Sequence, residues 1–162
     1  MCQILNVFFF LSNPGDIRLF AMFHSQTTKE NKSKILHELA SETPFMRIVF
    51  ATTALGMGVN ARHVRRVIHI TPPSTLENYF QEVGRAGRDG HLSEAVLYYN
   101  NSDIHAKTHV SDEMRQYCKT DTCLRKEILS YFGYRGMVQD RCCSNCHPAP
   151  LTLFPVNDEE HR

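Results

Sequence analysis

The chain has 162 residues, enough for one ordinary domain with or without a small appendage, and too few for a two-lobed enzyme. Its 18 basic residues nearly balance 17 acidic ones, for a formal net charge of +1, so bulk charge favours neither a polyanion partner nor an acidic tail. Any nucleic-acid contact must therefore come from local clusters, such as 62-RHVRR-66 and 85-RAGR-88.

The N-terminus reads MCQILNVFFFLSNPGD. This apolar run has no basic region before it and no small-residue cleavage pattern after it, and it is too short to span a bilayer. We interpret residues 1–16 as a buried or truncated segment, assign them to neither domain and expect no membrane partner. A run of this kind directly after Met1 favours an incomplete gene model.

The next segments alternate between strand and helix patterns. Residues 17-IRLFAMFHS-25 predict a buried strand, and Ser25, Thr27 and Thr28 offer N-caps for a helix that continues to about Ala40. Two continuous apolar runs then predict buried strands at 47-RIVFATTAL-55 and 64-VRRVIHI-70.

A capping box of Ser74 and Glu77 predicts a helix that continues to about Val83, and 95-AVLYY-99 predicts a third buried strand of this series. This order of elements is typical of an α/β fold with a parallel sheet flanked by helices. After Asp103 the pattern becomes helical, as in 112-DEMRQYC-118 and 122-TCLRKEILSYF-132.

These patterns divide the chain into an α/β domain at 17–102, a helical, cysteine-bearing subdomain at 103–150, and a loose tail at 151–162.

Two glycine-rich segments carry candidate phosphate chemistry. In 51-ATTALGMGVN-60, glycines one residue apart after a strand allow backbone N–H groups to approach a phosphate, although a tight turn alone would also need them. In 81-QEVGRAGRDG-90, Arg85 and Arg88 present guanidinium groups that fit phosphate oxygens at the end of a helix. The alternative for this segment is an exposed basic turn.

Together these segments resemble motifs V and VI of the second RecA-like lobe of superfamily-two helicases, and GRAGRDG is similar to the form in the RecQ family. The resemblance extends from about Ile17 to Pro148. A mild departure is Leu55, where many relatives have Phe; we expect it to alter packing more than chemistry.

The resemblance implies roles for individual residues. Arg88 is similar to the arginine finger that reaches the γ-phosphate of ATP, and Arg85 and Gln81 support the same catalytic cleft. The implied nucleotide-binding set is Gly56, Gly58, Asn60, Gly84, Arg85 and Arg88. The implied contacts to single-stranded or forked DNA are His24, Ser25, Thr52, Thr53 and Arg66.

Five of the six cysteines crowd into the last third of the chain while Cys2 stands alone, which favours a metal in a reducing compartment over disulfides. Cys143 and Cys146 form a C-x-x-C pair, and Cys142 and Cys123 complete a set of four thiolates for a structural zinc ion. Competing sets use Cys118 or His147 in place of Cys142, and a third possibility is free thiols. Because so short a segment buries little apolar surface, zinc would supply much of its folding free energy.

The cysteine segment resembles the RecQ-family zinc-binding subdomain, since 123-CLRKEILSYFG-133 is similar to that family's Cys-Arg-Arg helix. Leu124 replaces the first arginine of the pattern, which removes one possible polar or DNA contact, while Arg125 keeps the second. The histidines show no HExxH pattern, and we expect His24, His37, His63, His69 and His105 to be structural.

A nucleotide hydrolase also needs a P-loop lysine and a magnesium ligand, but the sequence contains no G-x-x-x-x-G-K-[ST]. The resemblance therefore implies one lobe of an ATP-dependent 3′→5′ DNA helicase, located in the nucleus and serving DNA repair and recombination. This chain would be inactive alone, binding ATP and magnesium only with the missing first lobe. Two alternatives are a non-enzymatic zinc module that binds DNA or a protein and competes with the full helicase, and an RNA helicase lobe of the DEAD-box kind.

Overall fold

The structure of the protein is a computed structural model, which describes residues 6–10, 20–42, 44, 46–52, 55, 61–138 and 142–147. The chain forms two compact units, Met1–Cys118 and Lys119–Arg162. Among the described residues, none of the helices combines the length and the apolar character that a bilayer crossing requires.

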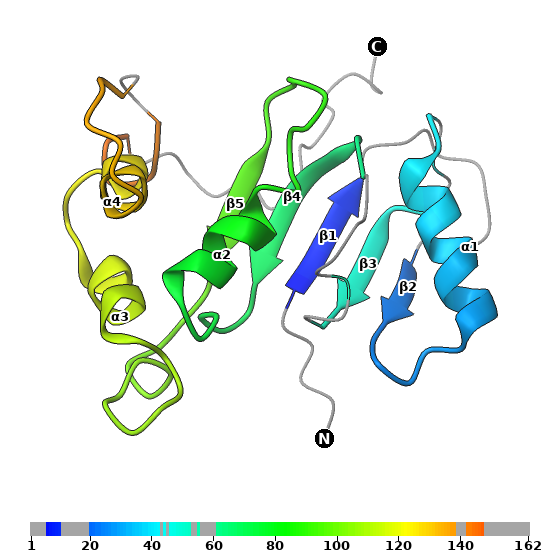
Figure 1. Cartoon of the computed structure of the whole chain (residues 1–162), viewed down its shortest axis with the longest axis horizontal. Helices are drawn as coiled ribbons and strands as arrows, with labels where there is room; N and C mark the ends of the chain where they lie inside the picture. Colours follow the sequence, from blue (N-terminus) through cyan, green and yellow to red (C-terminus); the bar gives the residue numbers. More distant parts are fainter. Residues whose placement is uncertain are drawn as a thin grey trace, which may run out of the picture. The chain divides into compact units, whose positions relative to one another are not determined.

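The first unit contains a five-stranded sheet (Figure 1). Its strands are β1 (Asn6–Phe10), β2 (Phe20–Phe23), β3 (Ile48–Ala51), β4 (Val64–His69) and β5 (Glu94–Leu97). The order across the sheet is β2-β3-β1-β4-β5. The pairs β2–β3 and β4–β5 are parallel, which confirms the predicted α/β class.

β1 departs from the predicted parallel arrangement, because it runs antiparallel to both β3 and β4. Its register pairs Val7 with Phe50 of β3 and with Ile68 of β4. The antiparallel β1 finishes at the same end of the sheet where β2 begins. Since β1 lies between them, β3 and β4 run in the same direction.

Helix α1 (Lys29–Ala40) begins at Thr28, whose side chain accepts the N–H of Asn31, so one of the three predicted N-caps is confirmed. Its Ile35 and Leu39 are buried in the core with residues of β3 and β4 such as Val49. Helix α2 (Leu76–Val83) ends where the sequence predicted, but its N-cap is Thr75 rather than Ser74. The Ser74 hydroxyl instead accepts a hydrogen bond from the side chain of Asn78.

Two predicted buried strands lie at the sheet edges and are more exposed than expected. In β2 the side chains of Phe20 and Met22 are exposed while Phe23 is buried, and in β5 none of the four residues is fully buried. An edge strand has a neighbour on only one side, and so it buries fewer of its side chains than a central strand does.

The predicted domain boundary between residues 102 and 103 lies inside the first unit. Ile104 and Met114 are buried, the N–H of Ser111 donates to the carbonyl of Ser74, and the ring of Tyr117 in α3 (Asp112–Lys119) lies 5.3 Å from that of Tyr79. The second unit contains α4 (Leu124–Tyr131) and the residues around it.

Candidate functional site

The segment after α2 forms a compact turn that carries both predicted phosphate-binding arginines. Gly84 ends the helix by donating its N–H to the carbonyl of Phe80. Gly87 then adopts a φ of +69°, in the left-handed region that favours glycine, and donates its N–H to the carbonyl of Val64 at 3.0 Å. The arginine turn, residues 84–90, is therefore attached to the beginning of β4.

The two arginines of this turn have different surroundings. Arg85 is buried, with 5% of its surface exposed, whereas Arg88 is exposed. Burial lowers the pKa of Arg85, the nearby charge of Arg88 lowers it further, and Glu82 acts in the opposite direction. The Arg88 Nε–H donates to the carbonyl of Gly84 at 3.2 Å, so this side chain folds along its own turn. Arg88 is the better placed of the two to meet a ligand from solvent.

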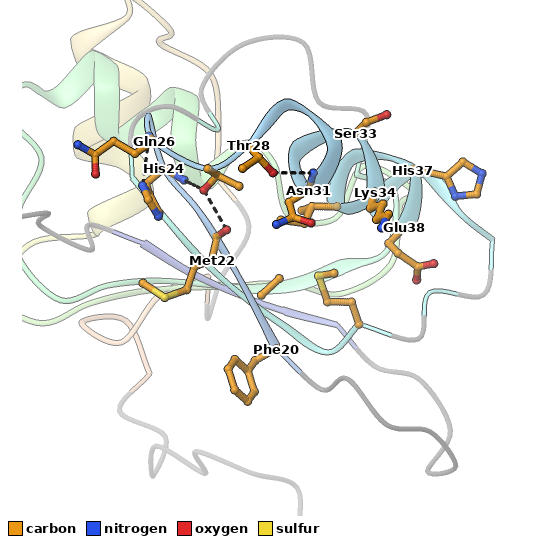
Figure 2. A pocket seen from close by; sticks show the side chains of 14 residues that line it. Phe20, Met22, His24, Gln26, Thr28, Asn31, Ser33, Lys34, His37 and Glu38 are labelled. Atoms are coloured by element: carbon orange, nitrogen blue, oxygen red, sulfur yellow. Dashed lines mark hydrogen bonds between the residues drawn. The ribbon is translucent and has the colours of Figure 1, made fainter.

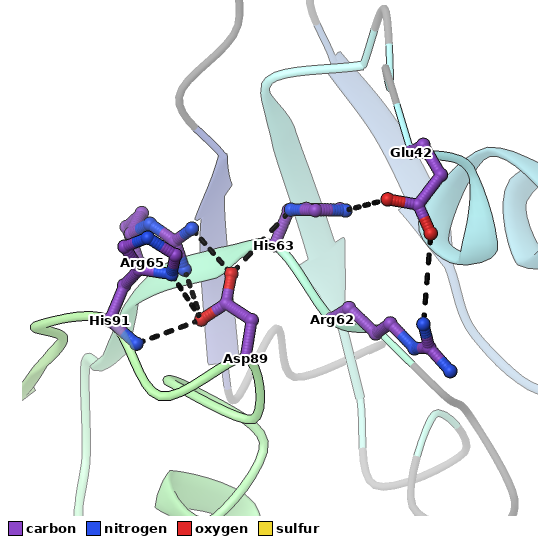
Figure 3. A network of polar contacts seen from close by, with 6 residues as sticks. All are labelled: Glu42, Arg62, His63, Arg65, Asp89 and His91. Atoms are coloured by element: carbon purple, nitrogen blue, oxygen red, sulfur yellow. Dashed lines mark hydrogen bonds and ion pairs between the residues drawn. The ribbon is translucent and has the colours of Figure 1, made fainter.

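Asp89, within the turn, is the centre of a polar network (Figure 3). The Arg65 guanidinium donates two hydrogen bonds to the carboxylate of Asp89, and the His91 N–H donates a third. These hydrogen bonds, those from Arg65 above all, hold the pKa of Asp89 well below its usual range. His63 lies between Asp89 and Glu42, at 3.5 and 3.6 Å from their carboxylates.

The predicted DNA contacts at His24 and Thr52 lie side by side. They follow the C-terminal ends of the parallel strands β2 and β3, and the Thr52 N–H donates to the carbonyl of Phe23 at 3.1 Å. His24 also lines a groove between β2 and α1, where its N–H donates to the hydroxyl of Thr27 (Figure 2). These residues lie where the parallel strands end. The arginine turn lies at the opposite end of the strands, where β4 begins.

Two other predicted DNA contacts have local partners. The Ser25 side chain is exposed, and its carbonyl accepts a hydrogen bond from the Lys32 ammonium. Arg66 lies within β4, away from the edge that carries His24, and its guanidinium pairs with Glu94 of β5 at 2.7–2.8 Å. Four further predicted residues lie outside the described ones, namely Thr53, Gly56, Gly58 and Asn60.

The second unit brings together the four predicted zinc ligands. The sulfur atoms of Cys123, Cys142, Cys143 and Cys146 all lie within 4.8 Å of one another. Two of the sulfur pairs, Cys123–Cys142 and Cys143–Cys146, are separated by 3.3 and 3.4 Å, distances much longer than a disulfide bond. A tetrahedral zinc ion with Zn–S bonds of ~2.3 Å separates its sulfur ligands by roughly 3.8 Å, so this donor set fits zinc.

Hydrogen bonds within this cysteine cluster favour the thiolate form of Cys143. Although burial raises the pKa of Cys143, hydrogen bonds from Cys146, Leu124 and Asn145 outweigh it and lower the pKa to about 6. The side-chain amide of Asn145 also donates to the carbonyls of Thr120 and Thr122, which connects the cysteine loop to the segment before α4. Cys123 is the N-cap of α4, where its sulfur accepts the Lys126 N–H.

The two competing ligands are placed differently. Cys118 is buried in the first unit, where its carbonyl accepts a hydrogen bond from the Tyr99 hydroxyl. His147 is exposed and donates its backbone N–H to the carbonyl of Cys143. Neither is a member of the four-sulfur group.

Comparison with known families fits this arrangement of arginine turn and cysteine cluster. The model of the helicase conserved C-terminal domain matches residues 4–90, and that of the RecQ zinc-binding domain matches residues 91–147. The chain belongs to the RecQ-like helicase family, of which it contains the helicase C-terminal and zinc-binding domains.

The individual relatives include RecQ helicases and one protein named as an RNA helicase. The chain is 38% identical to the ATP-dependent DNA helicase RecQ of Bacillus subtilis, over 62% of this chain and 20% of that protein. It is 32% identical to the RecQ-like DNA helicase BLM of Xenopus laevis, over 76% of this chain and 11% of the relative. A mimivirus protein named as an ATP-dependent RNA helicase is 34% identical, over 77% of the chain and 25% of the relative. The RecQ-like chain thus spans a quarter or less of each.

Sequence reasoning missed two polar pairs of this RecQ-like region. One is Arg65 with Asp89, and the other is His69 with Glu82, whose side-chain atoms lie 2.8 Å apart in the core. The signal for the first was a carboxylate directly after Arg88 and a basic cluster at 62–66. For the second, the signal was a histidine directly after the apolar residues Val67 and Ile68.

Proposed function

We propose that this chain supplies the second lobe of an ATP-dependent 3′→5′ DNA helicase of RecQ type. The observation that carries the proposal is the arginine turn, which presents an exposed Arg88 beside a buried Arg85 at the beginning of β4. The planar guanidinium of arginine offers paired N–H donors that match phosphate oxygens, and its charge offsets the charge that develops during phosphoryl transfer.

In this proposal Arg88 is the catalytic residue that reaches the γ-phosphate of ATP. Arg85 fixes the inner side of the same turn, the exposed Gly84 is its first residue, and the exposed Gln81 lies in the helix before it. Gly56, Gly58 and Asn60 remain predicted contacts to the nucleotide. The phosphate-cradling lysine and the magnesium ligands would come from residues outside this chain, so we propose that the chain alone does not hydrolyse ATP.

The DNA strand would lie at the opposite edge of the sheet. His24, Ser25 and Thr52 offer polar groups there, and Thr53 remains a predicted contact. Arg66 is a weaker candidate, because Glu94 already partners its guanidinium. A nucleotide at one edge and DNA at the other would be coupled through the strands between them.

We also propose that Cys123, Cys142, Cys143 and Cys146 hold a structural zinc ion. Support comes from the sulfur positions and from the match to the RecQ zinc-binding family. Bound zinc would supply folding free energy to the second unit, and the cysteines would keep it in a closed site with no position for substrate.

The hydrolysis test has two arms. The purified chain is expected to show no ATP hydrolysis with or without single-stranded DNA, and DNA-stimulated hydrolysis that Arg88→Ala abolishes would refute its inactivity. The intact mass of the polypeptide captured from its source shows whether a first lobe accompanies these residues. If it does, Arg88→Ala in that longer protein is expected to lower the kcat of ATP hydrolysis by about 10³–10⁵-fold. Arg135→Ala, which removes an exposed arginine outside both basic clusters, is the matched control.

A captured species near 18.6 kDa would instead favour the non-enzymatic zinc module. Such a near-neutral chain would neutralise few phosphates, so its DNA affinity should fall only shallowly with salt. Comparing single-stranded DNA with RNA as ligand decides between the DNA helicase and the RNA helicase reading. Relatives come from both bacteria and eukaryotes, so a nuclear location belongs to the proposal for a eukaryotic source only.

A further inference from the structure

The arginine turn is neither helix nor strand, so its position depends on a small number of attachments. The Gly87 N–H donates to the carbonyl of Val64 at 3.0 Å. Next to it, the Arg65 guanidinium binds the carboxylate of Asp89 through two parallel hydrogen bonds of 3.0 and 2.5 Å (Figure 3). Both attachments join the turn to consecutive residues at the beginning of β4.

The pairing of Arg65 with Asp89 differs from an ordinary surface ion pair. The side chains are only 20% and 14% exposed, and both guanidinium nitrogens of the fork are engaged. The neighbouring pair of Arg66 and Glu94 is a useful contrast, because its carboxylate is 56% exposed. Partly buried, bidentate pairs are stronger and more directional than exposed ones.

Asp89 also fixes the backbone just beyond the turn. Its carboxylate accepts the His91 N–H at 3.2 Å. A side-chain Cβ at Gly87 would lie 2.5 Å from the Ser93 hydroxyl, so the two sides of the turn are already in close contact there. The remaining ionic neighbours, His63 and the imidazole of His91, lie 3.5 and 3.4 Å from the carboxylate and outside strong hydrogen-bond distance. Arg65 is therefore the principal partner.

We propose that Asp89, held by Arg65, is a positioning residue for Arg88. Asp89 touches no substrate; it fixes the backbone one residue after Arg88 and thereby sets where the Arg88 guanidinium is presented. The inference rests on the proposed function, in which Arg88 meets the nucleotide phosphates. A displacement of about 1 Å in such a group can cost roughly 100-fold in rate, so a firm anchor has catalytic value.

Arg65 also neutralises the charge of the Asp89 carboxylate next to Arg88 in the sequence. Without its guanidinium, the Asp89 carboxylate, one residue along the chain from Arg88, would lose its principal partner and would compete with phosphate for the Arg88 guanidinium. Arg65→Gln should therefore harm phosphate binding more than Asp89→Asn does, and Asp89→Asn should restore part of what Arg65→Gln loses.

The test uses the zinc-loaded full chain and nuclear magnetic resonance. In Asp89→Asn and in Arg65→Gln, the Gly87 amide is expected to exchange with solvent about tenfold faster or more, and the heteronuclear NOE of the Arg88 Nε–H should fall. Arg65→Lys, which keeps one charged contact, should give an intermediate result. Because both substitutions break the same interaction, the double variant should exchange no faster than the single ones.

Arg66→Gln is the matched control, since it removes the same charge from the next residue of β4 and should leave both signals unchanged. The proposal is overturned if both signals are unchanged in Asp89→Asn, if Arg66→Gln changes them equally, or if amides of the core such as Val49 accelerate by the same factor. The last result would show loss of global stability instead of local positioning.

Phosphate competition is measured on the same variants by titrating tripolyphosphate while following the Arg88 Nε–H signal. Weaker binding in Arg65→Gln than in Asp89→Asn, with partial recovery in the double variant, supports this neutralising role of Arg65, and the reverse order overturns it. If Asp89→Asn changes the turn signals but Arg88→Ala leaves the kcat of the longer, ATP-hydrolysing protein normal, the positioning role of Asp89 stands and the proposed function is refuted.

Discussion

His69 and Glu82 form a hydrogen bond of 2.8 Å inside the protein, between the end of β4 and the last turn of α2. The His69 side chain has no exposed surface and that of Glu82 is 9% exposed. The ring of Tyr79 lies 5.1 Å from the imidazole, so the pair is enclosed by an aromatic neighbour. This bond fixes the helix that leads directly into the arginine turn.

Replacing Glu82 by an apolar residue should destabilise the first unit. Glu82→Leu leaves the His69 ring nitrogen buried without its partner, which we expect to cost about 1–3 kcal/mol in the free energy of unfolding. Glu82→Gln keeps the shape and a hydrogen-bonding atom, and should cost less. Urea denaturation measures both, and equal losses in the two variants would show that the hydrogen bond contributes nothing.

Gly87 and Gly90 should respond differently to alanine. Both have positive φ, +69° and +81°, but a Cβ at Gly87 meets the Ser93 hydroxyl and the His91 carbonyl, whereas one at Gly90 meets nothing within 4 Å. Gly90→Ala should cost about 1–2 kcal/mol from backbone strain, and Gly87→Ala about 2–5 kcal/mol because overpacking adds to the strain. Ser93→Gly should recover part of the loss at Gly87 and none at Gly90. Denaturant midpoints with unchanged m values provide the measurement.

Much of the fold follows from local pattern. The apolar runs around Val49 and Val67 predicted the interior strands β3 and β4, and the hydroxyl at Thr28 predicted the start of α1, since these signals depend on residues close in sequence. The direction of β1 could not be predicted, because strand pairing depends on contacts between distant segments. The exposure of Phe20 was missed for a related reason, because the residues of a strand do not show whether it lies at the edge of the sheet.

The candidate sites divide in the same way. Spacing alone indicated the arginine turn and the C-x-x-C pair, but the pairing of Asp89 with Arg65 joins residues separated by α2, and no local pattern reveals it. Likewise, sequence left Cys118 and His147 as alternatives to Cys142, and the clustering of sulfur atoms was needed to favour Cys142.

Removal of zinc should unfold the second unit selectively. The purified chain is expected to hold one zinc ion, and chelation should abolish amide protection in α4 while α1 keeps its protection, because structural zinc contributes apparent free energies of ~10–16 kcal/mol. Cys143→Ser should lose the metal, and Cys118→Ser should retain it. Metal analysis with hydrogen exchange tests this; loss of zinc from Cys118→Ser would restore the competing ligand set.

Stability above pH 9 should depend on Cys118. Burial raises the pKa of this thiol to about 11, so in the folded state it stays protonated at pH values where the unfolded chain, with a thiol pKa near 9.0, loses its proton. The unfolded state then binds fewer protons, and the free energy of unfolding should fall as pH rises from about 9 to about 11.

Cys118→Ala removes this contribution and should flatten the decline. Part of the slope should persist, because burial also raises the pKa of the neighbouring Tyr79 and Tyr99 and gives the same sign at higher pH. Urea denaturation of both proteins at a series of pH values measures the difference. The native thiol should also react slowly with iodoacetamide at neutral pH, since the thiolate is the nucleophile, and rapid alkylation without unfolding would contradict its burial.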